Sequence, residues 1–378
     1  MSKSTLLDKL QQKLAERAAQ GTLRALKTTT GLTDFCSNDY LGLARSEKLR
    51  ALIHKEEVKH KHLPLGATGS RLLSGHHPLF EELESLIARY HHAEAALLFN
   101  SGYAANVGLL SALPQRGDTV FYDEASHASM KDGLRLSFAK SYPFRHNNVK
   151  DLRQKLKHAA GQVYVLVESV YSMDGDQAPL RDLAQLCNQQ QAALIVDEAH
   201  AVGLYGERGE GLVSALGLEQ EVFARVLTYG KAMGLHGAAV VGPQILCNFL
   251  INYSRAFIYT TGLPTHALEA LKCAYTLLPE LGEERARVKK LAHLLYQKLN
   301  NLSGIRCTPE NSVILSVFLH QPQRLKELAA ALQQNGFDVR PVLPPTVPAG
   351  TDRLRVIVHA FNTEEEIEGL VQAIAKGT

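Results

Sequence analysis

Lys231 is the residue whose setting most suggests chemistry. It lies in LTYGKAMGLHG (residues 227–237), where the strand-like segment ARVLTY gives way to small residues and glycines. Most lysines of a globular protein lie on the solvated surface, which is the alternative interpretation for this one. A lysine that follows a buried strand is able to act as a nucleophile or a base, because desolvation lowers the pKa of its amine.

Four other strand-like segments also end in polar side chains. The polar groups are NSGYAAN from residue 100, DEASHASM from residue 123, ESVYSMDGD from residue 168 and DEAHAVGLYG from residue 197. Open α/β sheets bind ligands beyond the carboxyl ends of their strands. One polar strand end is common, but five in sequence predict a shared site.

Two nucleotide-binding fingerprints are missing from these strand ends. The sequence has no GxGxxG, and its nearest glycine run, GERGEG, follows no strand directly. It has no GxxxxGK[ST] either, because Ala232 occupies the hydroxyl position after Lys231 and Arg225 the first glycine position. A nucleotide-dependent oxidoreductase and an NTPase are therefore weak alternatives.

The side chains at the strand ends match the needs of pyridoxal phosphate (PLP). Its aldehyde forms a Schiff base with a lysine, and its pyridine nitrogen stays protonated beside a carboxylate. Its phosphate suits the backbone N–H groups of a helix N-terminus, helped by hydroxyl groups. Ser101 and Gly102 begin a helical segment, and Thr228 precedes Lys231 by three residues. PLP is therefore the expected cofactor.

Nine segments, in order along the chain, resemble the α-oxoamine synthase family. They are FCSNDYLGL, SRLLSGHHPLFEELE, NSGYAAN, SHASMKDG, ESVYSMDGD, VDEAHAVGLYGERGEG, LTYGKAMG, YTTGLP and PPTVPAGTDRLR. Members are fold-type I PLP enzymes that condense an amino acid with an acyl-CoA. The resemblance implies an α/β fold: a large domain with a mostly parallel seven-stranded sheet flanked by helices, and a smaller α+β C-terminal domain.

The resemblance implies roles around the cofactor. Lys231 carries the cofactor and then acts as the proton-transfer base. Asp197 pairs with the pyridine nitrogen, although a helix N-cap is the alternative for this aspartate. His200 donates to the phenolic oxygen of the ring, and His127 stacks on the ring face. Further cofactor contacts are expected from Ser172, Gly102, Tyr103, Thr228 and, towards the second subunit of a homodimer, Thr260 and Thr261.

Substrate-binding residues are implied in the same way. Arg355 matches the family's arginine for the amino-acid carboxylate, with Asn38 assisting. Arg353 alternates with Arg355 on a strand and is expected to face the other way. Glu168 is expected to line the site, although a strand-end carboxylate is often merely solvated. Arg24 matches an arginine that helps to recognise the acyl substrate, and a plain surface arginine is an equal alternative.

The short N-terminal region and PPTVPAGT are most similar to the biotin-pathway members of the family. These members imply decarboxylative condensation of L-alanine with pimeloyl-CoA, or pimeloyl-ACP, to 8-amino-7-oxononanoate. They have an arginine directly before PPTVPAG, where this chain has Leu343, with Arg340 three residues earlier. The acyl-chain preference therefore stays open. The alternatives are a sister synthase using glycine or serine with another acyl-CoA (2-amino-3-ketobutyrate CoA ligase-like or serine palmitoyltransferase-like), and a non-catalytic scaffold, which the presence of Lys231 and Asp197 opposes.

Alternating elements must position these residues. Apolar strand-like runs alternate with helical segments, which is typical of a parallel sheet covered on both faces. We expect an N-terminal helix and arm at residues 1–50, a large PLP-binding domain at 51–270 and a small α+β domain at 271–378. The first helix is expected to pack on another surface through an apolar stripe of Leu6, Leu7, Leu10 and Leu14.

Composition limits the binding partners and the cellular compartment that we expect for the protein. The 378 residues carry a net charge of only +3 without a polybasic run, which argues against nucleic-acid binding. Five scattered cysteines indicate a reducing compartment. No signal peptide is recognisable, and no apolar run approaches the roughly 20 residues of a membrane helix. We expect a cytoplasmic protein without a metal site, because the adjacent histidines at 76–77 and 91–92 cannot face one ion from a helix.

Overall fold

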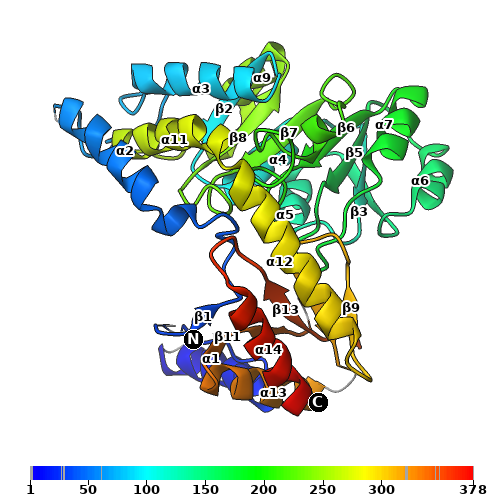
Figure 1. Ribbon diagram of the computed structural model, residues 1–378. Coiled ribbons are helices and arrows are strands. Elements are labelled where there is room, and N and C mark those ends of the chain that lie inside the picture. The colour runs from blue at the N-terminus through cyan, green and yellow to red at the C-terminus, as the bar shows by residue number, and fades with distance from the viewer. Residues whose placement is uncertain are drawn as a thin grey trace.

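A seven-stranded sheet forms the centre of the larger lobe of the molecule (Figure 1). The computed structural model describes residues 3–26, 28, 30–60, 62–319, 322–344, 346–348 and 350–377. The strands run in the order β2 (Ala95–Phe99), β8 (Ala238–Gly242), β7 (Ala224–Thr228), β6 (Ala193–Asp197), β5 (Val163–Glu168), β3 (Thr119–Asp123) and β4 (Lys140–Phe144). β8 alone runs opposite to the other six strands. The expected mostly parallel, seven-stranded α/β sheet is confirmed.

Both faces of this sheet are buried, which explains why its inner strands are apolar throughout. Along β5, Leu166 packs into a cluster on one face, whereas Val165 and Val167 pack into a cluster on the other. This alternation follows from the two-residue period of a strand. One face is covered by α4 (Gly102–Ala112), α5 (Ala128–Leu136), α9 (Gln244–Tyr253) and α10 (Arg255–Ile258). The other is covered by α3 (Pro78–Tyr90), α6 (Val149–Leu156), α7 (Leu180–Gln189), α8 (Leu212–Ala215) and α11 (Thr265–Leu277).

Strand β4 is the element of this sheet that the sequence pattern does not reveal. Its sequence is KSYPF, and most of its residues are partly or fully exposed. It pairs only with β3, so Pro143 lies in an edge strand, where a missing N–H is tolerated. An edge strand needs no apolar run, and the sequence gives no other signal for it.

A smaller lobe follows the large sheet (Figure 1). Its antiparallel sheet has the order β12 (Arg340–Val342), β13 (Arg353–Ile357), β10 (Ile314–Phe318) and β9 (Arg306–Thr308). It packs with α12 (Gly282–Asn300), α13 (Pro322–Gln334) and α14 (Glu364–Gly377). Near the N-terminus, β1 (Thr33–Asp34) pairs in parallel with β11 (Phe337–Asp338), so this segment joins the small lobe. The expected domain boundaries near residues 50 and 270 stay a prediction.

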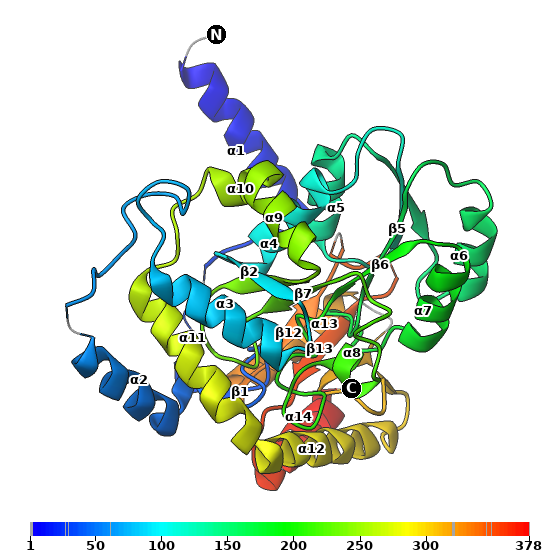
Figure 2. The same cartoon turned by 90° about the horizontal axis from the view of Figure 1, so that it is seen from above.

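The N-terminal helix α1 (Lys3–Ala19) projects away from the body of the protein (Figure 2). All four leucines of its apolar stripe are more than half exposed. Its C-terminal end is held by a hydrogen bond from Lys326 Nζ to the carbonyl of Gly21 at 3.1 Å. The other helical segments before the large sheet and after α11 are a 3-10 turn at Leu43–Arg45, α2 (Glu47–Lys59) and a 3-10 turn at Leu278–Glu280. No helix in the described ranges is long and apolar enough to cross a membrane.

A tight turn after β7 holds Lys231. The Gly234 N–H donates to the Lys231 carbonyl at 2.8 Å, and the Leu235 N–H donates to the Tyr229 carbonyl at 2.8 Å. Gly234 has φ +64°, and a Cβ atom there would overlap the backbone of Ala44. Glycine is therefore required at this position for two reasons: the backbone is left-handed, and the segment around Ala44 approaches too closely for a Cβ atom.

We predict that Gly234→Ala destabilises the protein much more than the matched change Gly217→Ala. Both glycines have positive φ, but a Cβ at Gly217 would meet nothing within 4 Å. Gly217→Ala should cost about 1–2 kcal/mol from backbone strain alone. Gly234→Ala should cost about 1–3 kcal/mol more from the clash. Denaturant unfolding of the two variants measures the difference, and equal losses would contradict the close approach.

Candidate active site

The carboxyl ends of three neighbouring strands bring the central polar residues together. Glu168 at the end of β5 lies opposite Asp197 at the end of β6 in the parallel register. Thr228 ends β7, and Lys231 follows three residues later. Glu168 and Asp197 are buried, and Lys231 is half-buried. Residues that are far apart in the sequence therefore share one edge of the sheet, as the strand-end pattern predicts.

Lys231 and Glu168 have shifted pKa values because they share a desolvated site. Burial lowers the pKa of the Lys231 amine, although the charges of Asp197 and Glu168 act in the opposite direction. Burial, reinforced by the charge of Asp197, raises the pKa of the Glu168 carboxyl, while Lys231 acts to lower it. Because its pKa is lowered, more of the Lys231 amine is neutral, and therefore nucleophilic, than in an ordinary surface lysine at the same pH.

Asp197 is fixed by two donors. The Asn106 side-chain amide donates to Asp197 Oδ2 at 2.7 Å, and the Ala199 N–H donates to Asp197 Oδ1 at 2.8 Å. The same Asn106 amide donates to Ser129 Oγ at 3.1 Å. Sequence reasoning did not single out Asn106. A signal was present, because Asn106 lies one helical turn after Gly102 in NSGYAAN and so faces the same way.

His127 is held as a neutral ring at the start of α5. Its Nδ1 accepts the Ser129 N–H at 3.2 Å and lies 2.8 Å from Ser129 Oγ. Burial, and to a smaller extent the charge of Lys231, lowers its pKa. The His127 backbone N–H donates to Glu168 Oε1 at 2.6 Å, which ties α5 to the end of β5. A neutral, fixed ring is suited to stacking on a flat ligand.

A chain of hydrogen bonds links His200 to Arg355 in the small lobe. His200 Nδ1 lies 2.6 Å from the Tyr40 hydroxyl, which donates to Asn38 Oδ1 at 3.1 Å. Arg355 Nη2 donates to the same Asn38 oxygen at 3.0 Å, and Arg355 Nε donates to the Ser172 carbonyl at 2.7 Å. Tyr40 is a further residue that sequence reasoning missed, although it lies in the segment SNDYLGL.

Burial sets the charge states of the side chains in this hydrogen-bond network. It lowers the pKa of His200 well below its ordinary value, and the nearby charges of Lys231 and Arg355 add to that effect. It also raises the pKa of the Tyr40 hydroxyl. His200 and Tyr40 are therefore both neutral at physiological pH, and Arg355 is the cation of this side of the site.

The N-terminus of α4 opens towards the end of β7. Ser101 caps the helix by accepting the Ala104 N–H at 3.1 Å. A Cβ atom at Gly102 would lie 3.0 Å from Thr228 Oγ1, so glycine lets the first helical turn approach that hydroxyl. Tyr103 is exposed, and its hydroxyl donates to Asp132 Oδ2 at 2.7 Å. Backbone N–H groups beside a threonine hydroxyl can hold an anion.

Thr260 and Thr261 lie near the same region, on the segment before α11. The Asn100 amide donates to Thr260 Oγ1 at 3.1 Å and to the Thr261 carbonyl at 2.8 Å. Thr261 is exposed. Its expected contact with a second subunit stays a prediction.

The remaining expected substrate residues lie apart from this cluster. Arg24 is exposed, and Leu343 packs at the edge of the core of the small lobe. Arg353 is buried, forms an ion pair with Asp174 and does not share the contacts of Arg355. Arg340 forms an ion pair with Asp338 at 2.7 Å. Within the described ranges, no group of three or more His, Cys, Asp and Glu side chains is arranged to hold a metal.

Comparisons with known proteins agree with this geometry. The family model for aminotransferase class I and II matches residues 30–374. The chain is 40% identical to 8-amino-7-oxononanoate synthase of Emericella nidulans, over 99% of this chain and 96% of that protein. It is also 40% identical to 8-amino-7-oxononanoate synthase of Marinobacter nauticus, over 91% of this chain and 87% of that protein.

Solved structures with the same fold point in the same direction. Serine palmitoyltransferase of S. paucimobilis, with PLP bound, has a TM-score of 0.90 at 27% identity, covering 100% of this chain and 98% of that one. 8-Amino-7-oxononanoate synthase of Francisella tularensis has a TM-score of 0.79 at 27% identity, covering 92% of this chain and 98% of that one. The chain therefore belongs to the aminotransferase class I and II family and, within it, to the α-oxoamine synthases.

Proposed function

We propose that the protein condenses L-alanine with pimeloyl-CoA, or pimeloyl-ACP, to 8-amino-7-oxononanoate with release of CoA and CO₂, a step of biotin biosynthesis. The observation that carries the proposal is the half-buried Lys231 beside the buried Asp197 at one edge of the large sheet. Relatives of the chain at 40% identity are 8-amino-7-oxononanoate synthases, which supports the same reaction. The family, and the PLP-bound structure of serine palmitoyltransferase, support PLP as the cofactor.

The side chains of the site fit PLP. Asp197 is a buried carboxylate whose two oxygens are each fixed by one donor, which leaves lone pairs for a protonated ring nitrogen. The close approach of Gly102 to Thr228 at the N-terminus of α4 suits a phosphate. His127 would lie on the ring, His200 would reach its phenolic oxygen, and Tyr103 and Ser172 would complete the pocket. When bound, PLP supplies an electron sink for the carbanion at the substrate Cα.

Arg355 would bind the amino acid, and Lys231 would transfer its Cα proton. Arg355 holds the α-carboxylate, because a guanidinium can donate two parallel hydrogen bonds to it. Asn38 and the Ser172 carbonyl orient that guanidinium from the other side. Lys231 Nζ has a pKa lowered to about 8, so more of it is neutral than of an ordinary lysine, and it would take the proton from Cα and later return one. Glu168, next to Lys231, would adjust its basicity.

A second candidate is a sister synthase that uses serine or glycine with another acyl-CoA. Two observations favour it: the high structural similarity to serine palmitoyltransferase and the apolar Leu343 in place of an arginine. An apolar side chain there suits an acyl chain without a terminal carboxylate. Arg24 is the cation that would compensate in the first candidate, and it is exposed.

We also propose a homodimer in the cytoplasm. The exposed leucines of α1 and the exposed Thr261 are surfaces that a second copy of the chain could cover. In such a dimer Thr260 and Thr261 would reach the cofactor phosphate of the other subunit. The five cysteines are all unpaired, as in a reducing compartment. The near-neutral charge supports small-molecule substrates and no nucleic-acid partner.

A substrate panel tests the reaction. Alanine, glycine and serine are each paired with acetyl-, pimeloyl- and palmitoyl-CoA, and free CoA thiol is followed with time. We expect the fastest release with alanine and pimeloyl-CoA, and only background release by Lys231→Ala. Faster turnover with serine and palmitoyl-CoA would transfer the assignment to the second candidate, and release by Lys231→Ala at the normal rate would remove the central role of Lys231.

The pH dependence of cofactor attachment tests the environment of Lys231. Attachment of PLP to the apoprotein needs the neutral amine, so its rate should rise with pH and level off below the 10.5 of an ordinary lysine. Glu168→Gln removes a carboxyl group whose ionised form favours the ammonium of Lys231, so the profile should move to lower pH. Stopped-flow absorbance measures both profiles. An inflection at the ordinary lysine value, or a shift to higher pH in Glu168→Gln, would contradict the arrangement.

Arg355→Lys tests the carboxylate site. The change keeps the charge but removes the paired hydrogen bonds, so KM for the amino acid should rise at least tenfold, about 1.5–3 kcal/mol. The bound-cofactor content should not change. Arg340→Lys is the matched control, because Arg340 lies directly opposite Arg355 on β12 and is paired with Asp338. Steady-state kinetics of both variants measure the two KM values. An equal rise in KM for the amino acid would show that Arg355 does not bind its carboxylate specifically.

A further inference from the structure

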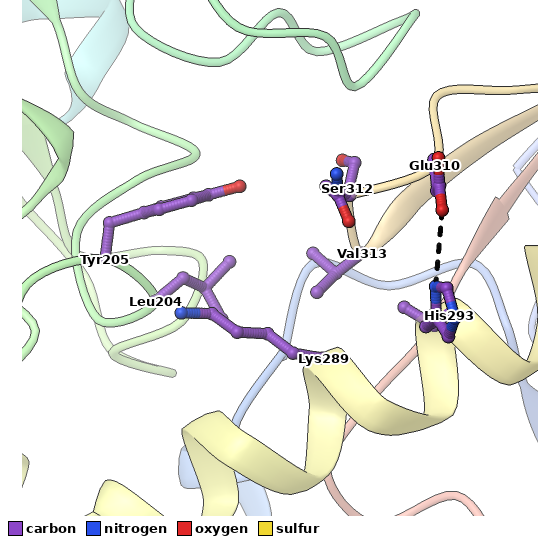
Figure 3. A pocket seen from close by; sticks show the side chains of 9 residues that line it. Leu204, Tyr205, Lys289, His293, Glu310, Ser312 and Val313 are labelled. Atoms are coloured by element: carbon purple, nitrogen blue, oxygen red, sulfur yellow. Dashed lines mark ion pairs between the residues drawn. The ribbon is translucent and has the colours of Figure 1, made fainter.

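A pocket that none of the candidate active-site residues lines lies where the two lobes meet (Figure 3). It is lined by Leu204 and Tyr205 from the turn after β6, by side chains of α12, and by residues 310–313 before β10. It encloses about 120 Å³. Three segments distant in the sequence therefore form one recess, and its chemistry points to one kind of ligand.

Lys289 supplies a positive charge that the protein does not neutralise. Its neighbour Lys290 pairs with Glu364 at 2.8 Å, and Lys298 further along α12 pairs with Glu368 at 3.0 Å. Lys289 has no carboxylate within ion-pair distance in the described part of the chain. Its ammonium lies 5.3 Å from the centre of the Tyr205 ring. The nearby charge of Arg285 adds to the positive potential at Lys289, which favours an anion at this position.

Two hydroxyl groups add to the donors of the pocket. Ser312 is buried, and its oxygen accepts the Ile314 N–H at 3.1 Å. The Tyr205 hydroxyl accepts the Gln177 amide at 3.2 Å. Neither hydroxyl proton has an acceptor among the described residues, so both are free to donate. In Figure 3 the Tyr205 hydroxyl points across the recess towards Ser312.

The rest of the wall is apolar, apart from the exposed Asn311 and from Glu310 and His293. Leu204, Ala292 and Val313 are buried side chains of the lining. Glu310 lies 4.0 Å from His293 at the far end, where Figure 3 draws them facing one another. The one carboxylate of the lining therefore lies at the His293 end of the pocket, whereas Lys289 lies beside Tyr205 and the apolar walls.

We propose that this pocket binds a small monocarboxylate with a compact apolar body. Lys289 and the hydroxyls of Ser312 and Tyr205 would hold the carboxylate, and Leu204, Ala292 and Val313 would cover the body. A single cation beside apolar walls matches one negative charge better than the two charges of a phosphate group.

The position of the pocket gives such a ligand access to both lobes. Ser312 leads into β10, whose Ser316 lies opposite Arg355 on β13. Tyr205 follows His200 by five residues in the large lobe. A bound carboxylate would therefore contact both parts of the chain that carry the candidate active site.

Calorimetric titration of the holoenzyme with benzoate tests the proposal, with benzamide as the neutral ligand of the same shape. We expect saturable binding of benzoate at one site per chain, and binding of benzamide at least tenfold weaker. Lys289→Met should weaken benzoate binding at least tenfold, and Ser312→Ala should weaken it severalfold. Lys290→Met is the matched control and should bind as the unaltered protein does, because Lys290 is engaged with Glu364.

Three results would overturn the proposal. They are the absence of saturable benzoate binding, equal binding of benzoate and benzamide, and unchanged binding by Lys289→Met. The last result would assign the carboxylate to another cation such as Arg355. Thermal unfolding of Lys289→Met beside Lys290→Met checks that both variants are folded; since both side chains are exposed, their midpoints should agree.

Discussion

The structure depends on placing an amine, Lys231, among two carboxylates at one edge of a buried sheet. Desolvation of three ionisable groups is costly, and it is offset by the attraction of Lys231 for the two carboxylates and by the hydrogen bonds that the carboxylates accept. The parallel register that sets Glu168 beside Asp197 fixes the carboxylates, and the glycine turn at Gly234 fixes the amine. The balance leaves Lys231 with a low pKa and Glu168 with a high one, which are the values that proton transfer near neutral pH requires.

The loop after β5 connects this edge to the small lobe. Its Ser172 carbonyl accepts from Arg355, its Asp174 pairs with Arg353, and its Met173 carbonyl accepts the Ser316 hydroxyl at 2.9 Å. A Cβ atom at Gly175 would overlap the Ile314 carbonyl, so the loop also lies directly against β10. Since the same loop begins at Glu168, the distance between the amine site and the arginine site is set by one short segment.

The sequence was sufficient for the parts of the fold and site that leave a local pattern. Buried parallel strands are apolar throughout, so the order of elements and the polar strand ends could be predicted. Edge strand β4 has no such pattern, and the pairing of β1 with β11 joins segments about 300 residues apart. Asn106 and Tyr40 lie in segments that were recognised, but their partners Asp197 and His200 are distant in sequence, so only the folded chain shows what they hold.

In the proposed reaction this framework would select an α-amino acid without selecting among the small ones. Glycine, alanine and serine share the same α-amine and α-carboxylate, so a fixed spacing between Lys231 and Arg355 suits all three equally. Differences of one methyl or hydroxyl group are discriminated by the neutral walls around Cβ, and are worth only about 1–3 kcal/mol in an apolar pocket. The acyl partner differs far more, in length and in terminal charge. In the proposed reaction the side chains that meet its far end, with Leu343 and Arg24 as the candidates, would therefore decide which acyl chain the product carries.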